Sequence, residues 1–186
     1  LKAKMPVVVS MGGYAASGGY YISCAANYIY SDPTTITGSI GIFGMFLNYS
    51  ELMKDKLGIK FDEVKTNKHA NFGTRSRFLN AEEMAILDKY IGKGYELFRK
   101  RVADGRKMSV AQVEQIAQGS VWLGSDALKI HLVDGIGSLD DAVKKAAQLA
   151  KLDEYYASEY QTSSSWYETL LASASGNSGS YLDEQM

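Results

Sequence analysis

The sequence contains few of the residues on which several common types of site depend. It has one cysteine and two histidines among its 186 residues. A single cysteine cannot form an internal disulfide. The histidines and the cysteine lie too far apart in the sequence to suggest a zinc site, and no phosphate-binding loop or dinucleotide fingerprint is present. We therefore expect neither a metal nor a cofactor.

Net charge and long apolar runs are also lacking. The formal net charge is −1, so no overall positive field would recruit nucleic acid or an anionic membrane. No stretch approaches the roughly 20 apolar residues that span a bilayer. The chain has no initiating methionine and no basic-then-apolar signal segment, and residues 1–4 lead directly into an apolar run. We therefore expect a fragment of a longer protein, with any membrane anchor upstream.

The composition is that of an ordinary globular domain. Hydrophobic residues make up 46% of the chain and charged residues 22%, which is typical of globular proteins. Short apolar runs alternate with helical patterns and with helix-capping sequences. This alternation predicts an α/β domain with a largely parallel sheet and flanking helices. The predicted strands are residues 6–11, 28–30, 36–43, 61–66 and 120–123, and the predicted helices are 15–26, a helix after Asn48, 80–103, a helix after Ser109 and 138–152.

The composition changes near Tyr155, where tyrosine and serine become frequent. We expect a main domain over residues 1–154 and a carboxy-terminal extension over 155–186. Within this extension we predict a short strand at 155–160, a short helix at 166–172 and a mobile polar tail.

Ser17 is the candidate nucleophile on chemical grounds. It follows a buried-strand pattern and two glycines, and it precedes a helix pattern. At such a junction, free backbone N–H groups and the positive end of the helix dipole favour negative charge on a reacting group. Gly18 would supply one such N–H, and the flanking glycines would let a substrate backbone approach closely. A helix cap or a tight-packing position is the alternative interpretation of Ser17.

Other serine-hydrolase patterns do not fit this segment. The nucleophile elbow requires glycine two residues before the serine, where this chain has Ala15. A Ser-x-x-Lys pattern requires lysine at the position of Tyr20. His69 lies in a polar loop pattern and His131 lies near a predicted helix end, so neither is favoured as the base of a triad. A lysine whose pKa is lowered by burial is the favoured base.

Five segments, in a fixed order across residues 5–150, closely resemble the signal peptide peptidase A family. The segments are 15–23, 35–42, 58–61, 119–124 and 132–137. The resemblance implies a Clp protease/crotonase-like fold and a serine–lysine dyad that degrades cleaved signal peptides. It also implies work at the extracytoplasmic (periplasmic) face of the bacterial cytoplasmic membrane, and assembly into a homo-oligomer.

The same resemblance assigns roles to individual residues. Ser17 matches the serine that is acylated, and Gly18 matches a donor of an oxyanion N–H. Ser39 matches a serine that orients the lysine amine, and a turn serine is the alternative interpretation. Shallow apolar pockets near the nucleophile would bind apolar peptide remnants, and the candidate lining residues are Tyr20, Ile42, Phe43 and Met45.

The lysine is the point at which the sequence departs from short members of the family. Short members carry the base one residue beyond a histidine that aligns with His69, and this chain has Ala70 there. Long, duplicated members take the lysine from their amino-terminal half. The resemblance therefore implies that this chain is the carboxy-terminal half of the long form, with its base outside the sequence and weak or no activity alone. Lys68 is the alternative base, although two residues along an extended segment span about 7 Å and the loop would need remodelling.

Two other functions stay open on the sequence alone. A crotonase-like acyl-CoA enzyme would share the fold, and its activity would survive a Ser17→Ala substitution. A non-catalytic assembly module would use small and aromatic residues for oligomerisation.

Overall fold

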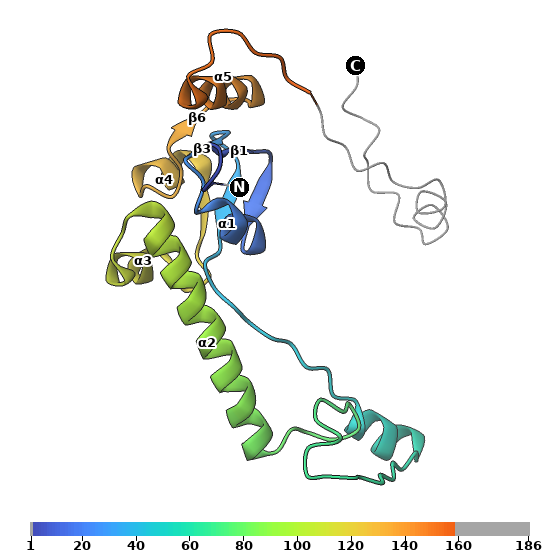
Figure 1. Ribbon diagram of the computed structural model, residues 1–186. Helices are drawn as coiled ribbons and strands as arrows, with labels where there is room; N and C mark the ends of the chain where they lie inside the picture. The colour runs from blue at the N-terminus through green and yellow to red at the C-terminus, as the bar shows by residue number, and fades with distance from the viewer. Residues whose placement is uncertain (1, 159–186) are drawn as a thin grey trace. The chain divides into compact units, whose positions relative to one another are not determined.

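A computed structural model describes residues 2–158 of the chain (Figure 1). Contacts between residues divide the chain into a compact unit, Leu1–Asp153, and a second unit, Glu154–Met186. The helix predicted at 166–172 and most of the predicted extension lie outside the described residues, as does part of the strand predicted at 155–160. The account below therefore concerns the first unit.

The strands of the described residues form two small sheets. In the first sheet all pairs are parallel and the strand order is β1–β3–β6. In the second sheet β4 is central, with β2 parallel on one side and β5 antiparallel on the other. The bounds are β1 (Val8–Met11), β2 (Tyr14–Ala16), β3 (Tyr28–Ser31), β4 (Ile36–Gly38), β5 (Val121–Leu123) and β6 (Gly135–Ile136). The predicted largely parallel α/β architecture is confirmed.

Helices flank these sheets, and the longest of them, α2, has α3 beside its carboxyl-terminal part (Figure 1). The capping sequences predicted at Asn80 and Ser109 form reciprocal capping boxes at the starts of α2 and α3. None of the helices in residues 2–158 is both long and apolar enough to cross a membrane. The bounds are α1 (Gly18–Ser23), a π-helix (Leu52–Lys56), α2 (Ala81–Arg106), α3 (Val110–Ile116), α4 (Gly124–Lys129) and α5 (Leu139–Ala150).

Several predicted elements differ from the structure. The helix predicted after Asn48 is a short π-helix, Leu52–Lys56, with no side-chain cap at its start, and residues 155–158 form no strand. Residues 61–66 form no strand, because their alternating pattern has no neighbouring strand with which to pair and Val64 is almost fully exposed. The extended segment predicted at 36–43 ends as a strand at Gly38, where positive φ angles turn the chain away from the sheet. The helix predicted to begin at Ala15 begins at Gly18, because the residues before it pair with β4.

An ion pair between the buried Arg106 and the partly exposed Asp134 links the end of α2 to the segment that precedes β6. The Arg106 side chain is only 7% exposed, and its Nη1 and Nη2 atoms donate to the Asp134 carboxylate at 3.0 and 2.7 Å. The same carboxylate accepts a hydrogen bond from the backbone N–H of Ile29 at 2.8 Å. Two residues before Asp134, the carbonyl of Leu132 accepts a hydrogen bond from the Tyr20 hydroxyl at 2.8 Å. These contacts join α1, α2 and β3 around the core.

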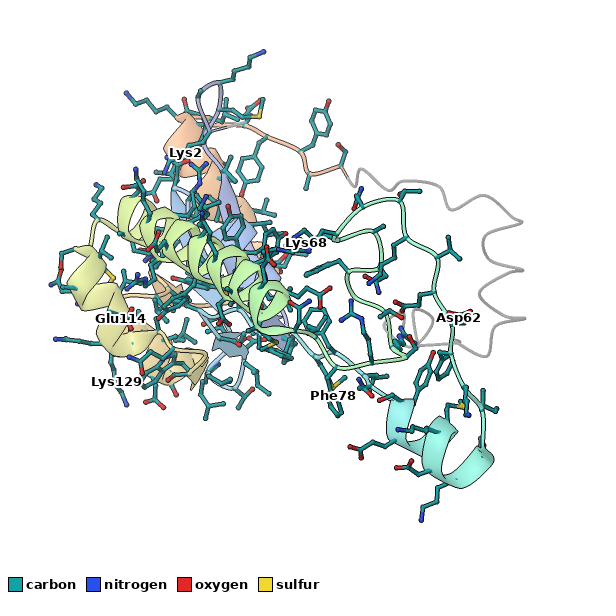
Figure 2. All side chains as sticks on the ribbon, turned by 90° about the horizontal axis from the view of Figure 1, so that it is seen from below. Lys2, Asp62, Lys68, Phe78, Glu114 and Lys129 are labelled. Atoms are coloured by element: carbon teal, nitrogen blue, oxygen red, sulfur yellow. The ribbon has the colours of Figure 1, made fainter. Side chains whose placement is uncertain are left out.

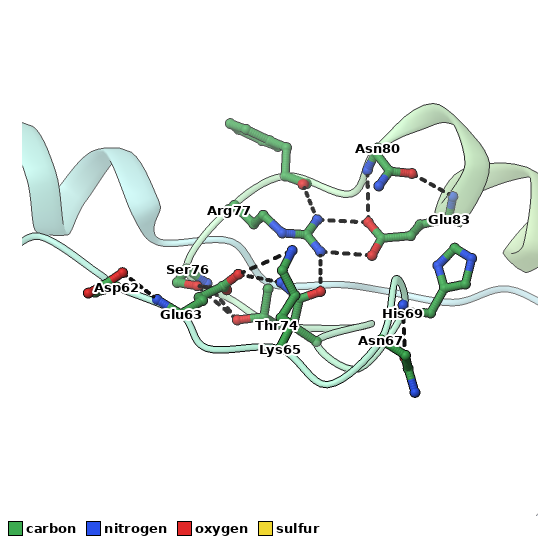
Figure 3. Close-up of polar contacts among 12 residues, drawn as sticks. Asp62, Glu63, Lys65, Asn67, His69, Thr74, Ser76, Arg77, Asn80 and Glu83 are labelled. Atoms are coloured by element: carbon green, nitrogen blue, oxygen red, sulfur yellow. Dashed lines mark hydrogen bonds and ion pairs between the residues drawn. The ribbon is translucent and has the colours of Figure 1, made fainter.

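A second ion pair, between Arg77 and Glu83, lies at the start of α2. The side chain of Glu83 is fully buried, and it accepts hydrogen bonds from both terminal nitrogens of Arg77 at 2.7 and 2.8 Å (Figure 3). It also accepts from the backbone N–H of Asn80 at 2.9 Å. The guanidinium of Arg77 and this N–H hold the pKa of the Glu83 carboxyl at about 2. The pair therefore links the loop before α2 to the helix itself.

We expect the ionisation of Glu83 to make the free energy of unfolding depend on pH below about pH 5. The pKa of the carboxyl is lowered by folding from about 4.3 in an unfolded chain, so its contribution is present above that value and is lost as pH falls towards 2. A Glu83→Gln variant should lose less stability than the wild type between pH 5 and pH 2. Thermal unfolding across this range measures the difference, with the exposed Glu96→Gln on the same helix as the control. Parallel pH profiles for Glu83→Gln and the wild type would contradict the prediction.

Candidate active site

The parallel pairing of β2 with β4 brings two serines to the same edge of a sheet. Ser17 comes directly after β2 and Ser39 directly after β4, and Ala16 is in register with Gly38. The backbone N–H of Ser17 donates to the carbonyl of Gly38 at 2.9 Å. Because the carboxyl ends of parallel strands meet at one edge, two residues far apart in sequence become neighbours there.

Both serines have backbone angles that are unusual for residues with a side chain. The φ angle is +52° at Ser17 and +48° at Ser39. Such conformations cost on the order of 1–3 kcal/mol each and persist only where the surroundings impose them. Strain of this kind is concentrated at functional sites, so its occurrence at two adjacent serines favours a functional interpretation of both.

Buried hydroxyl groups hold the two strands together beneath the serines. The hydroxyl of Thr37 donates to the carbonyl of Ala15 at 2.8 Å, and that of Thr35 donates to the carbonyl of Gly12 at 2.8 Å. Both threonine side chains are fully buried. Between the strands and β5, a Cβ atom on Gly38 would lie 2.7 Å from the Trp122 ring. Gly38 therefore packs so closely against Trp122 that a residue with a side chain would not fit there without displacing the ring.

Ser17 and Ser39 line one cavity of about 620 Å³. Ser17 is exposed and Ser39 is half-buried, so a ligand in this cavity can reach the hydroxyl of Ser17. The rest of the lining is mostly apolar or aromatic. It comprises Tyr14, Gly41, Ile42, Phe43, Ile91, Gly92, Tyr95, Gln118 and Gly119.

The backbone next to Ser17 offers a hydrogen-bond donor. Gly18 is the first residue of α1, and the N–H groups in the first turn of a helix have no intrahelical acceptor. In residues 2–158 the Ser17 side chain makes no capping hydrogen bond to α1, so its hydroxyl is not committed to the helix. A nucleophile beside a donor N–H is the arrangement that acyl transfer requires.

The structure places the remaining predicted site residues in different surroundings. Ile42 and Phe43, two of the candidate lining residues, line the cavity together with the two serines. Tyr20 does not line it, because its side chain is fully buried and its hydroxyl donates to the carbonyl of Leu132. Met45 lines a separate, largely apolar cavity of about 750 Å³ between residues 44–48, 73–79 and the start of α2.

Lys68 is paired elsewhere. Lys68 lies on the loop before α2 (Figure 2), and its amine is 2.5 Å from the carboxylate of Glu82 in the first turn of α2. It is not among the described residues that line the Ser17 cavity. The Lys68 side chain is 72% exposed, whereas a lysine base needs burial to lower its pKa. The structure therefore gives Lys68 the surroundings of a surface residue.

Sequence reasoning missed several cavity residues. Tyr14, Tyr95, Gln118 and Gly119 all line the cavity, but none was predicted as a site residue. Gly119 had a signal, because it begins one of the segments that resemble the signal peptide peptidase A family. Tyr95 had none, because a tyrosine on an amphipathic helix is as compatible with the core as with a cavity.

Comparisons with known proteins give the chain its family. Residues 1–153 match Peptidase family S49. Protease 4 of Salmonella typhi is 44% identical over 182 residues, which cover 98% of this chain and 29% of that protein. The putative signal peptide peptidase SppA of Enterococcus faecium is 32% identical, over 94% of this chain and 52% of that protein. Among solved structures, a membrane-bound stomatin-specific protease in complex with a substrate peptide is 17% identical, with a TM-score of 0.45, over 93% of this chain and 71% of that one.

These relatives are longer than the chain, which spans between 29% and 52% of the two curated proteins described. The family match nevertheless includes both serines, every strand and every helix of the described residues. It agrees with the resemblance carried by the five sequence segments. The chain belongs to peptidase family S49.

Proposed function

We propose that the chain carries the nucleophile of a serine endopeptidase that degrades cleaved signal peptides. Ser17 attacks the scissile carbonyl, and its hydroxyl oxygen becomes bonded to the carbonyl carbon. The peptide C–N bond then breaks, and water hydrolyses the resulting acyl-enzyme to free the serine. The N–H of Gly18 donates to the oxygen that becomes negative. A lysine amine accepts the proton of the Ser17 hydroxyl and later gives it to the leaving amine. Ser39 orients that amine.

One observation carries this proposal: the paired strands β2 and β4 deliver Ser17 and Ser39 to the same cavity, each with a strained backbone. A residue that caps the start of a helix normally has an extended backbone with a negative φ angle, so a capping role does not account for the positive φ angle of Ser17. The apolar lining from Ile42, Phe43 and Ile91 suits the leucine- and alanine-rich remnants of signal peptides.

The base in this proposal is a lysine that lies outside these 186 residues, in the amino-terminal half of a long, duplicated enzyme. Two observations support this. The chain has Ala70 where short family members carry their lysine, and no lysine is found in the cavity lining within residues 2–158. The complete enzyme would work as a homo-oligomer at the extracytoplasmic face of the bacterial cytoplasmic membrane.

The test compares the chain alone with a chimera that supplies the rest of the enzyme. In the chimera this chain replaces the matched 182-residue segment of Salmonella typhi Protease 4. We expect the chimera to cleave a leucine- and alanine-rich peptide, and the isolated chain to cleave it at least about 100-fold more slowly because it lacks the base. Fluorescence release from a quenched peptide measures both rates.

If the isolated chain cleaves the peptide and Ser17→Ala abolishes that cleavage, the proposal that the base lies outside these 186 residues is wrong. A Lys68→Met variant then tests whether Lys68 is the base. Cleavage by the chimera that survives Ser17→Ala would overturn the role of Ser17 itself.

A further inference from the structure

Tyr95 lies where three elements meet beside the Ser17 cavity. It is a half-buried residue of α2, and it lines the cavity. Its hydroxyl donates to Oε2 of Glu114 on α3 at 3.0 Å and accepts from the backbone N–H of Gln118 at 3.2 Å. Burial, and then the hydrogen bond to Glu114, raise the pKa of Tyr95. The hydroxyl is therefore protonated at neutral pH and can make both bonds at once.

The partners of Tyr95 are themselves held in place. Nη1 of Arg99 lies 2.6 Å from Oε2 of Glu114, and the Gln118 side-chain amide donates to Oε1 at 2.9 Å. The Arg99 guanidinium also lies 4.6 Å from the centre of the Tyr95 ring, within the range of a cation–π interaction. Glu114, labelled in Figure 2, thus accepts hydrogen bonds from three side chains, those of Tyr95 and Arg99 on α2 and that of Gln118.

The turn that begins at Gln118 holds Ser39 from both sides. The backbone N–H of Ser39 donates to the carbonyl of Ser120 at 2.8 Å. The N–H of Gly119 donates to the carbonyl of Ile40 at 3.0 Å. Gln118 and Gly119 have φ angles of +58° and +77°, so this turn, like Ser39 itself, has a conformation that its surroundings must impose.

The contact between the turn and the Ser39 segment is also very close. A Cβ atom on Gly41 would lie 2.8 Å from the backbone nitrogen of Gly119 and 2.9 Å from its Cα. Backbone therefore packs on backbone there, with no flexible side chain between the two segments. A displacement of the turn must displace residues 39–41 as well.

We propose that the Tyr95 hydroxyl is a positioning group for Ser39, and that it acts through the turn at residues 118–120. The hydroxyl does not touch the reacting atoms in this proposal. It fixes the N–H of Gln118, the turn fixes the backbone on both sides of Ser39, and Ser39 orients the amine of the base. The inference rests on the proposed function, because it gives Ser39 its role there.

Removing the hydroxyl alone is the sharpest test. Tyr95→Phe keeps the ring and its contact with Arg99 but leaves the N–H of Gln118 without its fixed partner. Gln118 is exposed, so water can replace the lost bond and the melting temperature should change little. We expect kcat of the chimera to fall about tenfold with KM within about twofold, because orientation affects the chemical step. Tyr90→Phe, at an exposed tyrosine of the same helix that is 76% accessible, is the matched control.

Two further measurements separate positioning from general packing. In the 186-residue chain, the amide hydrogens of Ser39 and Gly119 should exchange about tenfold faster in Tyr95→Phe than in the wild type, while core amides such as that of Cys24 exchange at unchanged rates. In the chimera, Tyr95→Phe should add less than about twofold to the loss already caused by Ser39→Ala, because the two residues act in series.

The outcomes distinguish this inference from the proposed function. If Tyr95→Phe has normal kcat and normal hydrogen exchange at Ser39, the positioning role of Tyr95 is wrong. The proposed function still holds in that case, provided that Ser17→Ala is inactive. Full additivity of Tyr95→Phe with Ser39→Ala would overturn the positioning role too, because an additive loss means that Tyr95 acts independently of Ser39. If Ser17→Ala retains activity, the proposed function fails, and the exchange rates still report whether Tyr95 holds the Ser39 backbone.

Discussion

Replacing Ser17 by alanine is expected to reduce kcat for peptide cleavage by the chimera by about 10⁴-fold or more, as the loss of a nucleophile does in other serine peptidases. The fold should be unaffected. Ser17 is exposed and its hydroxyl makes no capping hydrogen bond within the described residues, while alanine keeps the Cβ atom that the strained backbone already accommodates. The melting temperature should therefore stay within about 1 °C of the wild type. Steady-state kinetics and thermal unfolding of the same preparations measure the two quantities.

The controls decide whether the effect belongs to this one hydroxyl. Ser125→Ala, at a half-buried serine of α4 outside the cavity lining, should keep full activity. Ser39→Ala should lose activity but less than Ser17→Ala, because in the proposed mechanism it removes an orienting group and leaves the nucleophile. Activity of Ser17→Ala above about 1% of the wild type would exclude Ser17 as the nucleophile.

Replacing Asp134 by alanine is expected to destabilise the domain by about 3–5 kcal/mol. The substitution removes the counter-charge of the buried Arg106 guanidinium, which among the described residues keeps only the hydrogen bond from Nε to the carbonyl of His131, and it removes the acceptor of the Ile29 N–H. The unpaired buried charge dominates, because breaking one side of a buried pair costs more than the pair contributes as a whole. Urea denaturation of the isolated chain, followed by circular dichroism, gives the change in free energy of unfolding.

An exposed ion pair provides the matched comparison. Asp126 and Lys129 lie 2.8 Å apart on α4 with largely exposed side chains, so Asp126→Ala should cost less than about 1 kcal/mol. The Arg106→Met/Asp134→Leu double variant should recover part of the stability lost in Asp134→Ala, since it leaves no buried charge unpaired. A loss below 1 kcal/mol for Asp134→Ala would show that water or another group compensates Arg106.

Local sequence signals predicted those elements whose boundaries are set locally. The capping sequences at Asn80 and Ser109 mark true helix starts, because each cap is completed by a residue three positions later. The apolar run at 6–11 became β1, since its core-facing residues need a buried sheet. Residues 61–66 show the limit of this reasoning: alternation allows a strand, but a strand forms only where another strand is available to pair with it.

The candidate site shows the same division between local and long-range information. Ser17 could be selected because its strand, glycines and helix start are consecutive in the sequence. Tyr20 was misplaced in the site because its burial depends on Leu132, which lies more than 100 residues later. Tyr95 could not be found at all, because its partners come from another helix and a turn. The resemblance to the signal peptide peptidase A family supplied Ser39, which local chemistry alone would leave as a turn residue.

The antiparallel pair of β4 and β5 has a consequence for the order in which the site forms. It matches Ile36 with Leu123, and the nearby bond joins Ser39 to Ser120. Contacts over such sequence distances form late, because a long loop must close first. During synthesis Ser17 therefore leaves the ribosome long before the segment that fixes Ser39. A nascent chain that ends before β5 contains Ser17 but lacks the segment that fixes Ser39, so the geometry of the candidate site arises only once most of the domain has been made.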